Sequence, residues 1–252
     1  MKAEIRLILV LLTGLLLGGC NKHNTKPRNS NCHIQSVTLA IDSSSTSLTY
    51  YADGKLKTKT ISVQPVNITT TDTYTYTGDT VIETVMERII DSYFFSKTTI
   101  QFNADGLPLN YLEVQDTAGS IWTKCDYIYD GSQLNKINYT DFTGMAQTYT
   151  YNWSDGNIIS EITPFDTLYF DYYTDRPNSE GAGIEYALFS REGIVREWYY
   201  LPFLQNKNLI KSISGGATKY SYDFDATGKI TSTAIKRRDT LIGVVKYQYE
   251  CP

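Results

Sequence analysis

The sequence lacks a basic block, and charged residues of either sign make up only 20% of it. Its 23 lysines and arginines against 27 acidic residues leave a formal net charge of -4 at pH 7. Because binding to nucleic acid requires a positively charged face, this balance excludes DNA and RNA as expected partners. The chain has two histidines, and it has no P-loop, GxGxxG, HExxH or GxSxG motif. We therefore expect no enzyme of those classes and no nucleotide cofactor.

Motifs for metal binding and nucleophilic catalysis are also missing. A histidine-dependent nucleophile would have to use His33, because His23 lies in a polar tether. The cysteines show no CxxC spacing, which excludes the common zinc sites. The segment Asp223–Gly228 resembles the start of a calcium loop, but its twelfth position is Ala234 where that loop needs a bidentate Glu. We expect an ordinary hairpin turn there and no metal site.

Aromatic residues are abundant. Tyrosine alone occurs 21 times, aromatics reach 13% and hydrophobic residues 41% of the 252 residues. Disordered chains are poor in aromatic and β-branched residues, so this composition indicates a folded chain that favours β-structure. The length is sufficient for one large domain with a substantial core.

The N-terminal residues 1–20 have the order of a secretory signal. Lys2 and Arg6 precede a mainly apolar run from Leu7 to Leu17, and small residues follow. The run is shorter than the ~20 residues of a membrane-spanning helix. We interpret residues 1–19 as a signal peptide.

Leu17-Gly18-Gly19-Cys20 resembles the lipobox of bacterial lipoproteins. The resemblance implies cleavage before Cys20 and lipidation of that cysteine, with each buried methylene contributing ~0.8 kcal/mol of membrane affinity. The alternative is an ordinary signal peptide in which Cys20 is incidental. Asn21 at the next position implies, by the same resemblance, sorting to the outer membrane of a Gram-negative cell. The polar residues 20–31 then form a tether, and residues 32–252 form a single domain.

Three cysteines remain in an exported and therefore oxidising compartment. Cys32 opens the domain and Cys251 is the penultimate residue. A bridge between them would close nearly the whole domain, so we hypothesise a Cys32–Cys251 disulfide. Cys125 is then expected as a buried thiol.

Turn signals of Asp-Gly type recur along the domain. Each follows an alternating aromatic stretch such as Tyr127-Ile128-Tyr129, and each precedes an aliphatic alternation such as Ile158/Ile162. This pattern is typical of β-hairpins. The spacings between successive turn glycines are 24, 28, 25 and 25 residues, which indicates a repeat; the glycines are Gly54, Gly78, Gly106, Gly131 and Gly156. We predict an all-β fold, an antiparallel meander of repeated hairpins that forms a twisted open sheet or a sandwich.

Two segments are ambiguous. Residues 81–91 place apolar side chains at helical spacing, yet the turns and strands on both sides favour a strand. Between Pro164 and Asn208 the repeat loosens, and we expect a longer excursion from the sheet there.

The Tyr-x-Tyr-turn-Gly rhythm resembles the tyrosine-aspartate (YD) repeats of large bacterial shell proteins. It is more similar to a family of Gram-negative outer-membrane lipoproteins of unknown function with such β-hairpin repeats. The segments that carry the resemblance are Tyr172–Asn178, Lys207–Ile213, Tyr220–Ile230 and Tyr247–Cys251. The resemblance implies an architecture and assigns no activity.

The functional hypothesis therefore rests on the predicted export and lipidation of the chain and on its aromatic residues. We expect a non-enzymatic, lipid-anchored envelope lipoprotein that acts as a binding or structural module for a glycan or an envelope protein. Trp122, Trp153 and Trp198 are candidates for stacking on a ligand, although packing within the sheet is the simpler role for each. The alternative is a carboxylate-dependent glycan hydrolase or lyase, which would need two facing carboxylates.

Overall fold

A computed structural model of the chain describes residues 32–39, 44–63, 68–89, 92–178 and 206–251, and all regular structure within them is β-strand. The strands are β1 (His33–Leu39), β2 (Ser44–Tyr50), β3 (Leu56–Val63), β4 (Ile68–Thr77), β5 (Thr80–Ile89), β6 (Ser92–Phe102), β7 (Pro108–Val114), β8 (Trp122–Asp130), β9 (Gln133–Asp141), β10 (Ala146–Ser154), β11 (Asn157–Ile162), β12 (Thr167–Pro177), β13 (Asn208–Ile213), β14 (Thr218–Phe224), β15 (Ile230–Arg237) and β16 (Thr240–Glu250).

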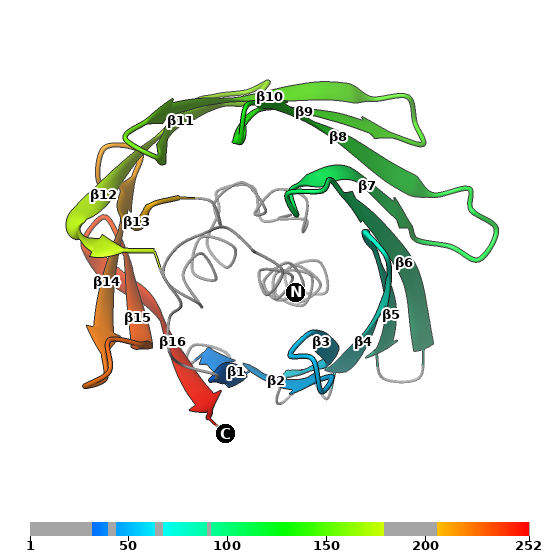
Figure 1. Cartoon of the computed structure of the whole chain (residues 1–252), viewed down its shortest axis with the longest axis horizontal. Helices are drawn as coiled ribbons and strands as arrows, with labels where there is room; N and C mark the ends of the chain where they lie inside the picture. Colours follow the sequence, from blue (N-terminus) through cyan, green and yellow to red (C-terminus); the bar gives the residue numbers. More distant parts are fainter. Residues whose placement is uncertain (1–31, 40–43, 64–67, 90–91, 179–205, 252) are drawn as a thin grey trace.

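Each strand pairs antiparallel with the next strand in the sequence, which confirms the predicted all-β meander of hairpins. The two edges of this sheet are where the structure departs from an open sheet or sandwich. β1 pairs with β16, with Val37 opposite Tyr247 and Leu39 opposite Val245, and the sheet closes into a barrel. Figure 1 shows the strands as a ring in which the first and last strands are neighbours. Closure removes the unpaired backbone groups that two free edges would expose.

Residues 81–89 belong to strand β5, as the hairpin rhythm favoured, and not to a helix. β5 pairs with β4 along ten residues, from Ile68 opposite Ile89 to Thr77 opposite Thr80, and with β6 on its other side. Pairing on both sides satisfies the backbone of β5 as a helix would, so the strand prevails over the helical spacing of its side chains. Residues 90–91 lie outside the described part.

The repeat glycines sit in the turns that lead from an even-numbered strand to the next odd-numbered one. These turns, together with Cys32 and Cys251, define one end of the barrel, here called the near rim; the hairpin loops at the other end define the far rim. Gly54, Gly106 and Gly156 have φ values of 81°, 77° and 82°. Only glycine adopts this left-handed region at little steric cost, which is why the turn signal recurs.

Burial alternates along the strands, as the sequence pattern predicts. In β10, Tyr149 and Tyr151 are buried whereas Thr148 and Asn152 are exposed. The buried side chains form one connected core cluster with members from β1 to β16. Because the described strands form a single closed layer, this cluster lies on the inner face of the barrel. The outer face carries mainly Ser, Thr, Asn, Asp and Lys, with exposed apolar side chains at Leu112, Ile128, Ile159, Ile162, Tyr169 and Leu241.

An aromatic layer follows the near rim on the inner face. On seven of the even-numbered strands, a Tyr or Trp of this layer points its polar atom at the preceding odd-numbered strand, where it donates to a main-chain carbonyl. Tyr50 donates to the Ile34 oxygen (2.5 Å), Tyr129 to Pro108 (2.8 Å) and Tyr222 to Ile210 (2.9 Å). The same bond recurs from Tyr76, Trp153, Tyr172 and Tyr249. The remaining even-numbered strand, β6, has Phe102 at this position, which has no polar atom to donate. The repeat is therefore an aromatic core position followed by an aromatic donor.

Replacing Tyr222 with phenylalanine is expected to lower the free energy of unfolding by ~1 kcal/mol, because the buried carbonyl of Ile210 loses its donor while the ring stays. Urea unfolding measures the difference. Tyr169→Phe is the matched control, since Tyr169 is exposed on β12, and it should change stability little. Equal losses in the two variants would contradict a structural role for the donor layer.

Candidate functional site

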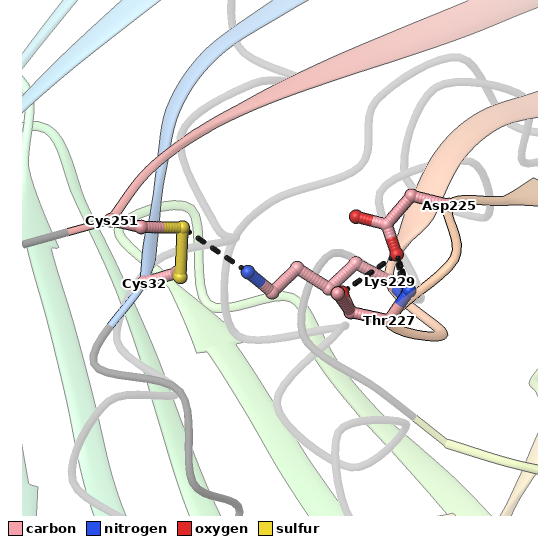
Figure 2. The surroundings of a disulfide bond; sticks show 5 residues. All are labelled: Cys32, Asp225, Thr227, Lys229 and Cys251. Atoms are coloured by element: carbon pink, nitrogen blue, oxygen red, sulfur yellow. Dashed lines mark hydrogen bonds between the residues drawn. A yellow bond between two sulfur atoms is a disulfide. The ribbon is translucent and has the colours of Figure 1, made fainter.

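The seam between β1 and β16 carries the chain's disulfide. Cys32 and Cys251 are joined across a sequence separation of 219 residues, at the near rim, where β1 begins and β16 ends. This is the pair that the sequence singled out; Cys125 is buried on β8, outside the disulfide. Figure 2 shows Lys229 reaching toward the bond, with its Nζ 3.3 Å from Cys251 Sγ. The same ammonium lies 5.3 Å from the centre of the Tyr249 ring.

The segment that resembles a calcium loop is a hairpin turn in the structure. The Asp225 carboxylate accepts from the main-chain N–H groups of Thr227 (2.8 Å) and Lys229 (3.0 Å) and from the Thr227 hydroxyl (Figure 2). The Thr227 hydroxyl is the main cause that lowers the pKa of Asp225, with the Lys229 N–H next. Asp223 accepts from Ser232 on β15, 2.5 Å away. The Asp225 carboxylate therefore accepts hydrogen bonds from donors of the turn, and Asp223 accepts one from the neighbouring strand.

His33, the one histidine of the described residues, has a packing role. Its ring stacks on Tyr50 at a centroid distance of 4.8 Å, at the start of β1. It also lies beside the turn, since a Cβ on Gly54 would come within 3.4 Å of His33 Nε2.

The structure separates the candidate tryptophans. Trp153 lies at the near rim and donates its Nε1–H to the Leu134 oxygen (2.7 Å), so it belongs to the aromatic donor layer. Trp122 opens β8 at the far rim, where it is half-buried opposite Val114. Trp198 lies outside the described residues, as do Cys20 and the tether. Trp122 and Trp153 therefore do not share one stacking surface.

A buried ion pair on the inner face was missed from the sequence. Lys59 on β3 and Asp72 on β4 are directly opposite in the strand register, form a salt bridge, and have fully buried side chains. The Lys59 ammonium also lies 5.8 Å from the centre of the Tyr74 ring. The hydroxyls of Thr46 and Thr70 are buried on the neighbouring strands. The sequence did carry a signal for the inward orientation of Asp72, because Asp72 stands two residues before Tyr74 and so lies on the same face of the strand.

Among the residues whose burial the structure describes, Asp72 and Glu161 are the fully buried carboxylates, and they bear on the enzyme alternative. Asp72 is paired with Lys59, whereas Glu161 on β11 accepts from the Tyr151 hydroxyl at 3.1 Å. β4 and β11 are seven strands apart in the ring. Each carboxylate therefore serves its own local partner, and the two do not form one acid–base pair.

Asp141 fixes the β9–β10 loop at the far rim. Its carboxylate accepts from the Thr143 hydroxyl (2.6 Å) and from the main-chain N–H groups of Thr143 and Met145. The Thr143 hydroxyl is the main cause that lowers the pKa of Asp141 below its usual 3.8. A lowered pKa stabilises the fold above pH 3.8, and this contribution is lost as the pH falls through the lowered value.

Asp141→Asn is accordingly expected to be less stable than the parent chain at pH 7. The difference should shrink as the pH falls below 3.8, because the parent carboxylate is then protonated too. Urea unfolding at a series of pH values measures it, with Asp130→Asn, an exposed carboxylate on β8, as the control. A difference between Asp141→Asn and the parent that stays constant with pH would refute the ionic origin of the effect.

Within the described part of the chain, no helix has the length and apolar character to cross a membrane. Over the same residues, no group of three His, Cys, Asp or Glu side chains gathers as metal ligands would.

Solved structures of similar fold are known. The chain is similar to a porin-like protein from Bacteroides uniformis, with 17% sequence identity and a TM-score of 0.60 over 86% of this chain and 96% of the other. At this identity the likeness shows the fold alone. No protein-family model matches the chain. No curated protein matches it either.

Proposed function

We propose that this protein is a lipid-anchored, non-enzymatic lipoprotein of the outer membrane, whose barrel stands in water and acts as a binding or structural module. The anchor is the lipid on Cys20, and the ligand is a glycan or an envelope protein. The polar outer face of the closed sheet is the observation that carries this proposal.

The outer face has the wrong chemistry for contact with lipid tails. Ser45, Ser47 and Thr49 form the outward row of β2, and Thr71, Thr73 and Thr75 continue it on β4. Sheets that face lipid carry an apolar band outward and polar residues inward, which is the reverse of the distribution here. The arrangement favours a barrel held near a membrane by a separate anchor.

The solved structure described as porin-like supports an envelope location. That description belongs to the other protein, and the shared fold does not transfer a channel activity to this chain. The inner face gives a reason against a pore, because its aromatic and aliphatic side chains are buried in a connected core.

Metabolic labelling with a radioactive fatty acid tests the anchor. The parent chain should take up label and fractionate with the outer membrane, whereas Cys20→Ser should take up no label. Cys125→Ser is the control for label at another cysteine. An unlabelled parent chain would overturn the anchor.

A second assay tests the binding role. The chain is titrated with soluble polysaccharides while tryptophan fluorescence and new reducing ends are followed. Saturable fluorescence change without new ends supports a glycan-binding module, and loss of that change in Trp122→Ala would assign Trp122 to the ligand. New reducing ends would establish the glycan hydrolase alternative in place of the binding role.

A further inference from the structure

Four exposed large apolar side chains lie on three successive hairpin tips of the far rim, whereas others, such as Leu112, Ile128 and Ile159, lie on the strands. The β7–β8 loop presents Ile121, the β9–β10 loop presents Phe142 and Met145, and the β11–β12 loop presents Phe165. Phe142 is 50% exposed and Phe165 71% exposed. Single exposed apolar side chains are ordinary on a protein surface, and the informative feature here is their recurrence on three neighbouring tips of one rim.

These tips leave few polar main-chain groups to be desolvated. In the β7–β8 loop, Asp116 accepts from the N–H of Ile121 (3.1 Å) and from the Ser120 hydroxyl. In the β11–β12 loop, the Thr163 hydroxyl accepts from the N–H groups of Phe165 (3.1 Å) and Asp166 (3.0 Å). Asp141 satisfies the β9–β10 loop in the same way. Internal bonding lowers the cost of moving a loop out of water.

The charges at the tips restrict what can lie against them. The three loops contain no lysine or arginine, and each carries one aspartate: Asp116, Asp141 and Asp166. An anionic surface would be repelled, and so would the same rim of a second copy. The β13–β14 and β15–β16 tips on this rim, at residues 214–217 and 238–239, carry no large apolar side chain, and the second of them carries Arg238, so the repulsion from anionic surfaces applies to the three apolar tips alone.

The tips are spread out rather than clustered. They belong to β7 through β12, six consecutive strands of the sixteen in the ring, and these strands follow the right, upper and left parts of Figure 1. A compact pocket on another protein cannot receive side chains distributed along such an arc. A flat, deformable apolar surface can receive all of them.

We propose that the far rim rests on a lipid surface of neutral headgroups, with Ile121, Phe142, Met145 and Phe165 inserted at the interface. This inference rests on the proposed function, which holds the chain at a membrane. Cys32 lies at the near rim, but the twelve-residue step from Cys20 to Cys32 spans up to ~40 Å. The nine-residue β9 measures ~30 Å along its length, so the lipid and the tips can reach one bilayer.

The test uses the full chain with Cys20→Ser, so that no lipid contributes. Phe165→Cys is labelled with an environment-sensitive fluorophore and titrated with phosphatidylcholine vesicles. Ser221→Cys, on the exposed outer face of β14, is the matched control. We expect a saturable, several-fold rise in emission at position 165 and none at position 221. Adding Phe142→Ser should abolish most of the rise, and vesicles with phosphatidylglycerol should reduce it.

No rise at position 165 with phosphatidylcholine would overturn the inference, and so would an equal rise at position 221. The proposed function is decided separately, by the fatty-acid label on the parent chain. If the chain carries the label and shows no response at position 165, the lipid anchor is supported and the lipid contact of the far rim is refuted. If the chain carries no label but responds at position 165, the lipid contact of the far rim is supported and the lipid anchor is refuted.

Discussion

Loss of the disulfide is expected to lower the free energy of unfolding by ~5 kcal/mol. The bond between Cys32 and Cys251 closes a loop of 219 residues, and in the chain-entropy model a loop of that length restricts the unfolded chain by about this amount. Cys251→Ser and the reduced parent chain should both show the loss in urea unfolding. The β1–β16 seam should then be the first part of the sheet to exchange its amide hydrogens, because no covalent bond holds its two strands together.

Glu250→Gln is the control, since it changes an exposed side chain on the same strand and keeps the bond. It should leave stability close to that of the parent chain. A loss below ~1 kcal/mol in Cys251→Ser would mean that strand pairing alone closes the barrel and that the unfolded chain gains little freedom from the missing bond.

Lys59→Met is expected to cost ~3–5 kcal/mol, because it leaves the Asp72 carboxylate buried without its ionic partner. The double variant Lys59→Met/Asp72→Leu removes both charges and should recover most of that loss. Urea unfolding of the two single variants and the double variant gives the coupling directly.

Lys57→Met is the matched control on the same strand, because Lys57 is exposed and its replacement should change stability by less than ~1 kcal/mol. Additive losses in the double variant would contradict the pairing of Lys59 with Asp72. A neutral effect of Lys59→Met would show that the ammonium does not stabilise the inner face.

The hairpin meander could be read from the sequence because its signals are local. An aromatic pair such as Tyr149 and Tyr151, followed within a few residues by Gly156, specifies one strand, one face and one turn. The same local signals favoured a strand at residues 81–91 without settling it, and the structure pairs residues 81–89 with β4 and β6.

Closure of the sheet into a barrel could not be predicted from such local signals. Pairing of β1 with β16 joins residues about 210 positions apart, and nothing within either strand names its partner. The Cys32–Cys251 hypothesis was the one long-range signal, and it placed the two ends together without specifying a barrel. The donor layer was equally hidden, because the acceptors of Tyr129 and Tyr222 are main-chain carbonyls that every residue has.

The candidate site was predicted less well. Trp153 proved to be part of the donor layer, and Trp122 lies at the other end of the barrel. The apolar tips were missed because Phe142, Met145 and Phe165 lie in short turns that show no apolar alternation. Their exposure becomes visible only when the loops are placed on one rim.

The most direct test of the account is the behaviour of the Cys20→Ser chain without detergent. A polar outer face predicts that this variant stays in solution without detergent, sediments as a single folded species and keeps the near-ultraviolet circular dichroism of its buried tyrosines. A chain that needs detergent to stay folded, or that aggregates without it, would contradict the assignment of the outer face to water.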